Sequence, residues 1–324
     1  MLTISRYQEE FLEYLKAHSF KKEPERLYAP VQYILHLGGK RLRPVLTLLT
    51  TDIFGGDYRK ALGAAMAVEV FHNFTLLHDD IMDDAPLRRG MPSVHEKWDV
   101  NTGILSGDVM LVLSYTFFES YDAELQAKLI RLFNKTAREV CEGQQYDMDF
   151  ETRNDVTLPE YLKMIAYKTA VLVGSAMKMG AFIAGAGDEE AAAIYDFGLN
   201  LGIAFQLQDD YLDSFGDAET FGKKIGGDII ENKKTFLYLK ALENLNGGEA
   251  GLLRDLYNTT PADTEKKIET VKALFVSSGA AGLIREEITR YTEKAFAGIE
   301  SLSVDPEKKQ LLLEFGKKLI DREV

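Results

Sequence analysis

Hydrophobic side chains recur every three to four residues along most of this chain, a spacing that predicts α-helices. The pattern predicts helices over residues 1–16, 30–37, 44–54, 58–84, 101–121, 124–150, 161–186 and 189–215, with two or three more in the remainder. Alternating runs of Val, Ile and Thr, which are typical of strands, are nearly absent. The sequence therefore predicts an all-α fold.

Short stretches rich in glycine, proline or charge separate the predicted helices. Residues 86–92 are expected to be a loop that carries Arg88 and Arg89, and residues 215–234 a second, longer loop. Neither a linker nor a shift in composition divides the chain, so we expect one domain over residues 1–324.

Composition and charge narrow the class of protein. The chain has 324 residues, 46% of them hydrophobic, which is enough for a large core. A net charge of −13 argues against a nucleic-acid partner. The only cysteine, Cys141, cannot form an internal disulfide, which fits the reducing cytoplasm. No signal peptide and no membrane span are expected, because Glu9, Glu10 and Glu13 interrupt the first segment and Lys178 interrupts the longest apolar run.

Two acidic motifs share the pattern Asp-Asp-x-x-Asp, at residues 79–83 and 209–213, and each lies where a long predicted helix ends. One helical turn brings Asp79 and Asp83 to the same face, and likewise Asp209 and Asp213. If two such helices faced each other, their carboxylates would line a cleft suited to Mg²⁺, which prefers oxygen ligands and often shares them with phosphate. The alternative is an ordinary solvated acidic surface, but two motifs of the same form favour the metal site.

Basic residues follow each acidic motif. Arg88 and Arg89 come after the first, and Lys223, Lys224, Lys233 and Lys234 come after the second. A third basic segment, Gly-Gly-Lys-Arg-Leu-Arg-Pro, occupies residues 38–44. Carboxylates that hold metal ions beside arginine and lysine are suited to binding a polyanion.

These motifs together resemble those of the trans-polyprenyl diphosphate synthases. The resemblance rests on residues 79–83 with Arg88-Arg89-Gly90, on residues 209–213 preceded by Phe205-Gln206, and on residues 38–44, and it extends from about residue 35 to 240. It implies the isoprenoid synthase fold, an all-α bundle around a central cavity, and a homodimer. The implied reaction is head-to-tail condensation of isopentenyl diphosphate with an allylic diphosphate (dimethylallyl, geranyl or farnesyl).

The resemblance also implies roles for individual residues. About three Mg²⁺ ions per active site would be held by carboxylates of both motifs, namely Asp79 and Asp83 for two ions, Asp209 for the third, and Asp80, Asp210 and Asp213 in support. The cations that would contact the allylic diphosphate are Arg88, Lys168, Lys223 and Lys233. Those that would hold isopentenyl diphosphate are Lys40, Arg43, His72 and Arg89. Thr169 and Gln206 would lie beside the developing allylic cation. His78 is expected to be a packed helix residue rather than a catalyst.

Product length is expected to depend on residues that precede the first acidic motif. Phe74 and Phe71 lie about 7.5 Å and about 12 Å from Asp79 along a helix axis, a depth that suits three or four isoprene units. Phe74 followed by Thr75 resembles synthases that make geranylgeranyl diphosphate (C20). A helical projection places Thr75 rather than Phe74 nearer the Asp79 face, and Phe71 would shorten the pocket further, so farnesyl diphosphate (C15) stays open. Ordinary core packing is the alternative role for both rings.

Two other functions share part of this pattern. A class I terpene cyclase has the first acidic motif, but it usually has an Asn/Ser/Glu metal motif in place of residues 209–213. A non-catalytic subunit of a heteromeric synthase tends to lose one motif, whereas this chain retains both. The sequence therefore favours an active, Mg²⁺-dependent short-chain synthase.

Overall fold

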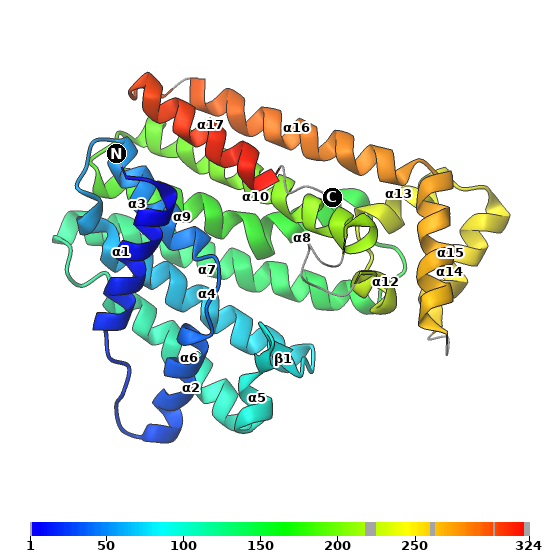
Figure 1. Ribbon diagram of the computed structural model, residues 1–324, viewed down its shortest axis with the longest axis horizontal. Helices are drawn as coiled ribbons and strands as arrows, with labels where there is room; N and C mark the ends of the chain where they lie inside the picture. The colour runs from blue at the N-terminus through cyan, green and yellow to red at the C-terminus, as the bar shows by residue number, and fades with distance from the viewer. Residues whose placement is uncertain (1, 218–224, 260–262, 301, 321–324) are drawn as a thin grey trace. The chain divides into compact units, whose positions relative to one another are not determined.

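The chain folds almost entirely into α-helices, as its apolar spacing predicts (Figure 1). The computed structural model describes residues 2–217, 225–259, 263–300 and 302–320. They divide into two compact units, one made of Met1–Lys135 with Ser175–Ala192, the other of Thr136–Gly174 with Ala193–Val324. Whether both belong to one domain, as the sequence predicts, stays a prediction, and each unit is described separately.

The first unit is built on the helix that ends in the first acidic motif. Its elements are α1 (Ile4–Ala17), α2 (Glu25–His36), α3 (Leu42–Ile53), the 3₁₀ turn η1 (Tyr58–Ala61), α4 (Leu62–Met82), β1 (Leu87–Arg88), β2 (Met91–Pro92), α5 (Val94–Lys97) and α6 (Val100–Thr116). Helix α4 packs against α3 on one side and α6 on another. Most of its side chains from Ala64 to Phe74 are buried, so α4 is the core helix that positions the motif.

Three long helices contribute to both units: α7 (Ala123–Thr152), α9 (Val171–Ile183) and α10 (Asp188–Phe215). The other elements of the second unit are α8 (Leu158–Ile165), the π-helical turn η2 (Ala166–Ala170), α12 (Gly227–Ile230), α13 (Phe236–Asn244), α14 (Gly247–Asn258), α15 (Thr264–Ser277), α16 (Ala280–Glu300) and α17 (Pro306–Ile320). Helix α16 packs against α13, α15 and α17.

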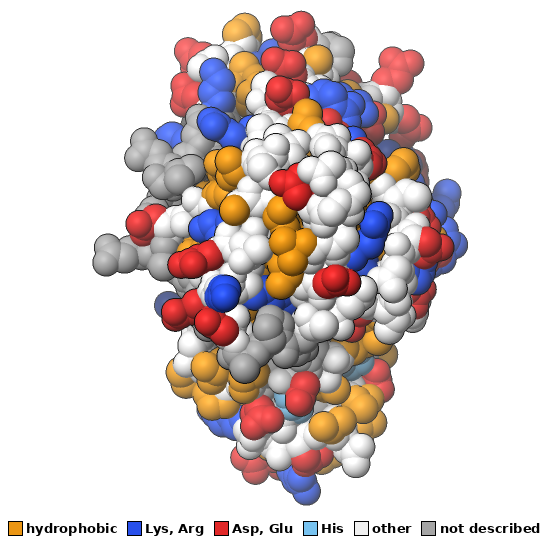
Figure 2. Space-filling view, turned by 90° about the vertical axis from the view of Figure 1, so that its right-hand side faces the viewer, with side chains coloured by type: hydrophobic (Ala, Val, Ile, Leu, Met, Phe, Trp, Pro, Cys, Tyr) orange, Lys and Arg blue, Asp and Glu red, His pale blue; other side chains and the backbone are white. Residues whose placement is uncertain are grey.

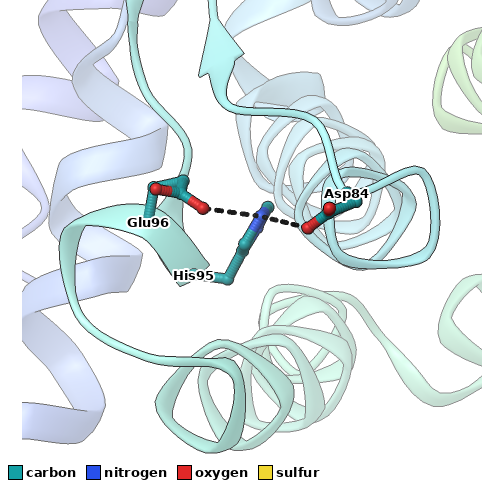
Figure 3. Close-up of side chains that lie close together, drawn as sticks. All are labelled: Asp84, His95 and Glu96. Atoms are coloured by element: carbon teal, nitrogen blue, oxygen red, sulfur yellow. Dashed lines mark ion pairs between the residues drawn. The ribbon is translucent and has the colours of Figure 1, made fainter.

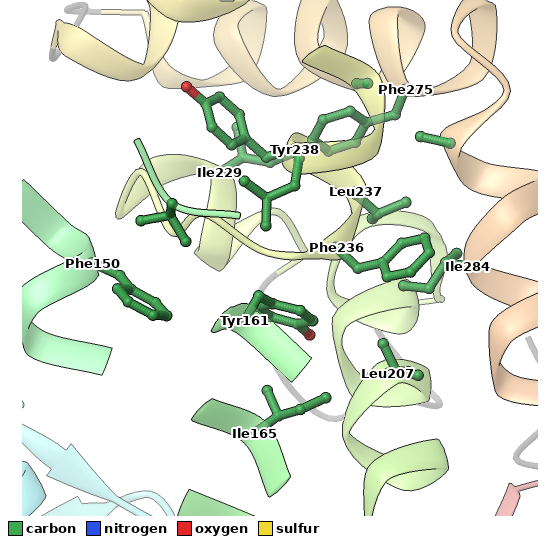
Figure 4. Close-up of a cluster of buried hydrophobic side chains, with 14 of the residues drawn as sticks. Phe150, Tyr161, Ile165, Leu207, Ile229, Phe236, Leu237, Tyr238, Phe275 and Ile284 are labelled. Carbon is green, nitrogen blue, oxygen red and sulfur yellow. The ribbon is translucent and has the colours of Figure 1, made fainter. Parts of the chain in front are cut away.

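The second unit encloses a core of large apolar side chains (Figure 4). Tyr161, Leu207, Leu237 and Phe275 are each at most 1% exposed and come from four different helices. Full burial of one such side chain contributes about 1.5–3 kcal/mol. This core fixes α8 and α10, the helices from which the second acidic motif and its hydrogen-bond partners project.

Local signals account for several of the observed boundaries. Thr157 and Glu160 form a capping box at the start of α8, with the Thr157 amide and hydroxyl donating to Glu160 Oε2 at 2.9 and 2.8 Å. Asp99 caps α6 by accepting from the Thr102 amide at 2.8 Å. Polar side chains thus satisfy backbone groups that have no partner within the helix.

Four sequence predictions about elements are corrected. Helix α2 begins at Glu25, so Pro30 lies inside it rather than at its start, because Pro24 takes the N-cap position. Residues 86–92 form a β-hairpin instead of an irregular loop. The predicted helix over 161–186 contains the π-helical turn η2. Beyond residue 235 the described residues form five helices rather than two or three, because further breaks occur near Gly279 and after Leu302.

The hairpin has a simple cause. The pairs Leu87 with Pro92 and Arg88 with Met91 leave Arg89 and Gly90 as a two-residue turn. Both turn residues have positive φ, 55° and 76°, which is the conformation of a type I′ turn. Glycine adopts this φ without strain, so Gly90 allows the hairpin that presents Arg88 and Arg89.

Charged side chains of both signs lie on the surface of the protein (Figure 2). Acidic and basic side chains lie interspersed with apolar ones on the face shown in Figure 2. Among the described residues, we find no helix with the length and apolar character that spanning a membrane requires.

Candidate active site

The first acidic motif occupies the last turn of α4. The Asp83 amide donates to the Asp79 carbonyl at 2.9 Å, which closes that turn and places both residues on one helix face. Asp79 is half-buried and Asp83 is exposed. A carboxylate pair of this spacing on one face can hold a divalent cation and leave part of its coordination sphere to another ligand.

Asp80, the next residue along α4, projects about 100° around the helix from Asp79 and has a different environment. Its side chain is 1% exposed and accepts hydrogen bonds from Arg88 Nε at 2.9 Å (Oδ1) and 3.1 Å (Oδ2), with a further contact from Nη2. Burial raises the pKa of Asp80, and the adjacent guanidinium opposes that rise. Asp80 thus anchors Arg88, on the hairpin, to α4.

A basic cluster lies in the same unit. Arg43 Nη1 lies 3.1 Å from His72 Nε2, which joins α3 to α4. Burial, and then the charge of Arg43, lowers the pKa of His72 well below its ordinary value, so the ring is neutral and accepts this hydrogen bond. Burial also lowers the pKa of Arg43 to about 10, which leaves the guanidinium charged at neutral pH.

Arg89 and the glycines before Lys40 belong to this cluster. The Arg89 guanidinium donates to the Gly38 carbonyl. Gly39 has a φ of 122°, and a Cβ there would come within 2.8 Å of Arg89 Cζ. Both the conformation and the close approach therefore require glycine at position 39. Lys40 is exposed beside it.

The same unit contains a buried ion pair, between Arg41 and Glu69, that the sequence analysis did not predict. Arg41 and Glu69 contact each other with side chains 2% and 3% exposed. Arg41 Nη2 also donates to the Leu35 carbonyl at 2.6 Å, and Asn73 Nδ2 donates to Glu69 Oε1 at 3.1 Å. A glutamate inside the otherwise apolar start of α4 was the available signal, because a buried carboxylate needs a partner.

The predicted chain-length residues lie on α4 before the motif. Phe71 is fully buried, its ring 5.2 Å from that of Phe133 and 5.6 Å from that of Phe74. Phe74 is 8% exposed and packs edge-on against His78 at 4.8 Å. The Thr75 hydroxyl donates to the His72 carbonyl at 2.8 Å. Both rings therefore have packing partners whatever their role in product length.

The prediction that His78 is a packed residue is confirmed. Its Nε2 lies 3.2 Å from the Ile104 carbonyl on α6. A Cβ at Gly107 would lie 2.1 Å from that same nitrogen, so the ring fills the space that this glycine leaves.

The second acidic motif lies near the end of α10. Asp209 is half-buried, whereas Asp210 and Asp213 are 6% and 9% exposed. Asp210 accepts hydrogen bonds from the Tyr161 hydroxyl and from Gln206 Nε2, the latter at 3.0 Å. Burial, and next the charge of Asp228, raises the pKa of Asp210 well above its ordinary value.

Thr169 and Gln206 are brought together, as the resemblance implies. The Thr169 hydroxyl donates to Gln206 Oε1 at 3.2 Å, and the Gln206 amide in turn donates to Asp210. The network fixes the orientation of the Gln206 amide, because its oxygen accepts from Thr169 while its nitrogen donates. Tyr161 completes the network, and no sequence motif pointed to it.

The neighbouring pair Lys168 and Asp147 links η2 to α7. Lys168 Nζ lies 2.5 Å from Asp147 Oδ2, and both side chains are about one-quarter exposed (27% and 24%). A Cβ at Gly143 would lie 2.3 Å from the Lys168 amide nitrogen, so α7 approaches the π-helical turn at a glycine. π-helical turns often occur at functional sites, and this one contains the Lys168-Thr169 pair.

Asp213 organises the segment after the second motif. Its carboxylate accepts from the Asp228 amide at 3.0 Å, and its carbonyl accepts from the Gly226 amide at 2.6 Å. Lys233, 39% exposed, pairs with Glu231 at 3.0 Å. Lys234 is buried and donates to the carbonyls of Phe150 and Glu151, which is a structural role. Lys223, also predicted to bind substrate, lies outside the described residues.

Comparison with known proteins identifies the family. Residues 24–274 match the family described as polyprenyl synthetase. The chain belongs to the polyprenyl synthetase family. It is 39% identical over 302 residues to the geranylgeranyl diphosphate synthase of Methanosarcina mazei, covering 93% of this chain and 91% of that protein. It is 38% identical to the geranylfarnesyl diphosphate synthase of Natronomonas pharaonis, with 93% and 91% covered.

Solved structures agree with this assignment. A geranylgeranyl pyrophosphate synthase crystal structure, 54% identical, superposes with a TM-score of 0.95 over 100% of both chains. The structure of a geranylgeranyl pyrophosphate synthase from Corynebacterium glutamicum, complexed with isoprenyl diphosphate and magnesium, has a TM-score of 0.85 at 25% identity, with 99% of this chain and 98% of that chain covered.

These findings confirm the predicted fold and enzyme class. The chain has the all-α isoprenoid synthase fold and is a prenyltransferase of the short-chain prenyl diphosphate synthase type. Neither alternative, the terpene cyclase nor the non-catalytic subunit, is supported by these relatives. The family depends on Mg²⁺ and uses isopentenyl and allylic diphosphates.

Proposed function

We propose that this enzyme condenses isopentenyl diphosphate head-to-tail with allylic diphosphates and releases mainly the C20 product, geranylgeranyl diphosphate. The observation that carries the proposal is the pair of Asp-Asp-x-x-Asp motifs, each at the end of a long helix and each accompanied by cationic side chains of its own unit. Relatives named geranylgeranyl diphosphate synthase support the C20 product over C15.

The proposed metal ligands are Asp79 and Asp83 in the first motif and Asp209 in the second, for about three Mg²⁺ ions. The fit rests on the donor set, because carboxylates one helical turn apart and accessible from solvent suit a hard cation. Asp80 and Asp213 would support these ligands from neighbouring positions, because Asp80 already accepts hydrogen bonds from Arg88 and Asp213 accepts one from the Asp228 amide. Bound Mg²⁺ would neutralise the diphosphate and make it a better leaving group.

Cationic side chains would hold the two substrates. Arg88, Lys168, Lys233 and Lys223 are proposed for the allylic diphosphate. Lys40, Arg43, His72 and Arg89 are proposed for isopentenyl diphosphate. The short links already present, from Arg88 to Asp80 and from Lys168 to Asp147, keep these cations in place before substrate arrives. Such preorganisation lets the cations stabilise charge that develops as the C–O bond breaks.

Thr169 and Gln206 are proposed to face the allylic cation. The Thr169 hydroxyl and the Gln206 amide are dipolar groups, and their oxygens, the negative ends, would stabilise positive charge. Their hydrogen bonds to each other and to Asp210 hold those dipoles in a fixed orientation. The isopentenyl double bond would attack the cation, and the proton lost afterwards would pass to the released diphosphate.

A direct assay tests the proposed activity. Purified protein is incubated with Mg²⁺, radiolabelled isopentenyl diphosphate and, separately, dimethylallyl, geranyl or farnesyl diphosphate. We expect labelled geranylgeranyl diphosphate from all three primers and a complete loss of product with EDTA. Product that ends at farnesyl diphosphate would overturn the C20 proposal, and no elongation of any primer would overturn the proposed function.

Product length is proposed to be set by Phe74, with Phe71 behind it. The two rings lie on α4, 5.6 Å apart, and Phe74 is the nearer to the motif. Replacing Phe74 with alanine removes the ring, so we expect products at least one isoprene unit longer, as measured by chromatography of the dephosphorylated alcohols. Phe197→Ala, which opens a fully buried position in the other unit, is the matched control and is expected to leave product length unchanged.

Two outcomes separate the chain-length role from packing. The Phe71→Ala and Phe74→Ala double variant is expected to lengthen the product further than Phe74→Ala alone. If both single variants kept the wild-type product while losing only stability, the rings would serve core packing alone.

We further propose that the enzyme is a cytoplasmic homodimer. Helix α6 exposes Val100, Ile104, Leu105 and Val112, whose side chains are 41–62% exposed. Large apolar residues gathered on one helix support an interface with a second copy. The single cysteine supports a reducing compartment.

A further inference from the structure

Three potential metal ligands converge at the base of the hairpin that carries Arg88 and Arg89. His95 and Glu96 belong to α5, and Asp84 follows α4 (Figure 3). His95 Nε2 lies 3.9 Å from Asp84 Oδ1 and 3.8 Å from Glu96 Oε1. One ligand atom from each residue lies within 4.8 Å of the others. Figure 3 shows the imidazole between the two carboxylates.

The imidazole nitrogen in this cluster lacks a hydrogen-bond partner. The His95 side chain is 5% exposed, and its Nε2 makes no hydrogen bond although it is buried. The other ring nitrogen, Nδ1, lies 3.3 Å from the Ser93 hydroxyl, which fixes the ring orientation. A buried polar atom without a partner is unfavourable, and distances of 3.8 and 3.9 Å are too long for hydrogen bonds. The nitrogen is therefore aimed at a position that a ligand could fill.

The spacing suits a transition-metal ion. Ligands bound at about 2.0–2.1 Å in a tetrahedron lie roughly 3.4 Å apart, which is about 0.4–0.5 Å less than the distances from His95 Nε2 to the two carboxylate oxygens. The two carboxylate oxygens lie within 4.8 Å of each other. The Asp84 and Glu96 side chains are 98% and 52% exposed, so each can rotate to bring its oxygen closer to the imidazole and to the other carboxylate. A nitrogen with two carboxylate oxygens favours Zn²⁺ over Mg²⁺, because imidazole is a ligand for borderline ions and Mg²⁺ prefers oxygen alone.

We propose that Asp84, His95 and Glu96 form a zinc-binding site that clasps the two ends of the β1–β2 hairpin. Asp84 precedes β1 and His95 follows β2, so an ion bound to both closes the loop between them. Because that hairpin carries Arg88 and Arg89, the ion would restrict the motion of two proposed substrate-binding cations.

This site differs from the proposed Mg²⁺ ligands of the first motif. Asp84 lies beyond the last residue of α4 and has a φ of 49°, which takes it out of the helix that holds Asp79 and Asp83. The ligands of the proposed zinc site include a histidine, whereas the two Asp-Asp-x-x-Asp motifs contain none. The two kinds of site can therefore be separated by the ion they select.

Calorimetry with Zn²⁺ and visible spectroscopy with Co²⁺ as its probe, both in excess Mg²⁺, test the proposal on the full chain. We expect one Zn²⁺ or Co²⁺ to bind at this site per chain, and the Co²⁺ absorption to report a nitrogen ligand. His95→Gln is expected to weaken binding at least about tenfold, the least that loss of a direct ligand should cause. His36→Gln, an exposed histidine outside the cluster, is the matched control and should bind like the wild type.

Further variants make each outcome decisive. Asp79→Asn should retain the Zn²⁺ site, and Glu96→Gln should weaken it even if His95→Gln fails to fold. Slower hydrogen exchange in residues 85–93 on adding Zn²⁺ is expected in the wild type and absent in Glu96→Gln. The proposal would be overturned by the absence of Zn²⁺ binding above the Mg²⁺ background, or by binding that Glu96→Gln leaves unchanged. Loss of that binding in Asp79→Asn would then assign it to the first acidic motif.

Discussion

Replacing Asp79 with alanine is expected to lower kcat/KM for condensation by at least about 10²–10³-fold, the range found when one group that stabilises developing charge is lost. The side chain is half-buried on the face of α4 that also carries Asp83. Without it, the proposed Mg²⁺ ligands of the first motif are reduced to one carboxylate. Steady-state kinetics with farnesyl diphosphate as primer measure the effect.

The dependence on Mg²⁺ distinguishes a lost metal ligand from a damaged fold. Asp79→Ala should need a higher Mg²⁺ concentration for half-maximal rate, while its circular dichroism and melting temperature stay close to wild type. The matched control is Asp255→Ala, which removes an exposed carboxylate from α14 and should leave the rate unchanged. Turnover near the wild-type value in Asp79→Ala would refute the assignment of this residue as a metal ligand.

The second large effect concerns stability. Replacing Arg41 with methionine is expected to lower the free energy of unfolding by about 3–5 kcal/mol, because it leaves Glu69 buried without its cationic partner. The Glu69 side chain is 3% exposed, so little water can replace the guanidinium. Urea denaturation followed by circular dichroism measures the change.

A double variant isolates the cause. In Arg41→Met with Glu69→Leu, both charges are replaced by apolar groups of similar size, so we expect much of the lost stability to return. Some loss should persist, because the Leu35 carbonyl no longer accepts from Arg41. Arg59→Met, on η1 at the surface, is the control and should change stability by less than about 0.5 kcal/mol. A double variant no more stable than Arg41→Met would show that the charge left on Glu69 is not the cause.

Much of the site could be predicted because its chemistry is local in sequence. An Asp-Asp-x-x-Asp motif places its first and last carboxylates on one helix face whatever surrounds it, and α4 and α10 both form as predicted. That Thr169 and Gln206 lie close together was anticipated only through the family resemblance, because the two residues lie on different elements; their hydrogen bond was not predicted. Binding roles for these residues, and for Lys40, Arg43 and Lys168, stay predictions.

Other features depend on contacts between residues far apart in the sequence, and the spacing of hydrophobic residues along the chain does not predict such contacts. The hairpin at residues 87–92 forms because Arg89 and Gly90 both adopt positive φ, and the segment contains too few residues to show strand periodicity. Tyr161 contacts Asp210 only because α8 packs near α10. Asp147 contacts Lys168 only because α7 packs near η2. The Arg41–Glu69 pair likewise joins residues far apart in the chain.

By itself the sequence determined the helical class, the two carboxylate motifs and the family, because periodicity and short motifs are properties of neighbouring residues. Tertiary structure decided how each carboxylate is used. Asp80 and Asp210 are buried and hold Arg88, Tyr161 and Gln206 in place, whereas Asp79 and Asp83 keep access to solvent. The physical reason is desolvation, since a buried carboxylate is stable only with hydrogen-bond donors that the fold brings to it.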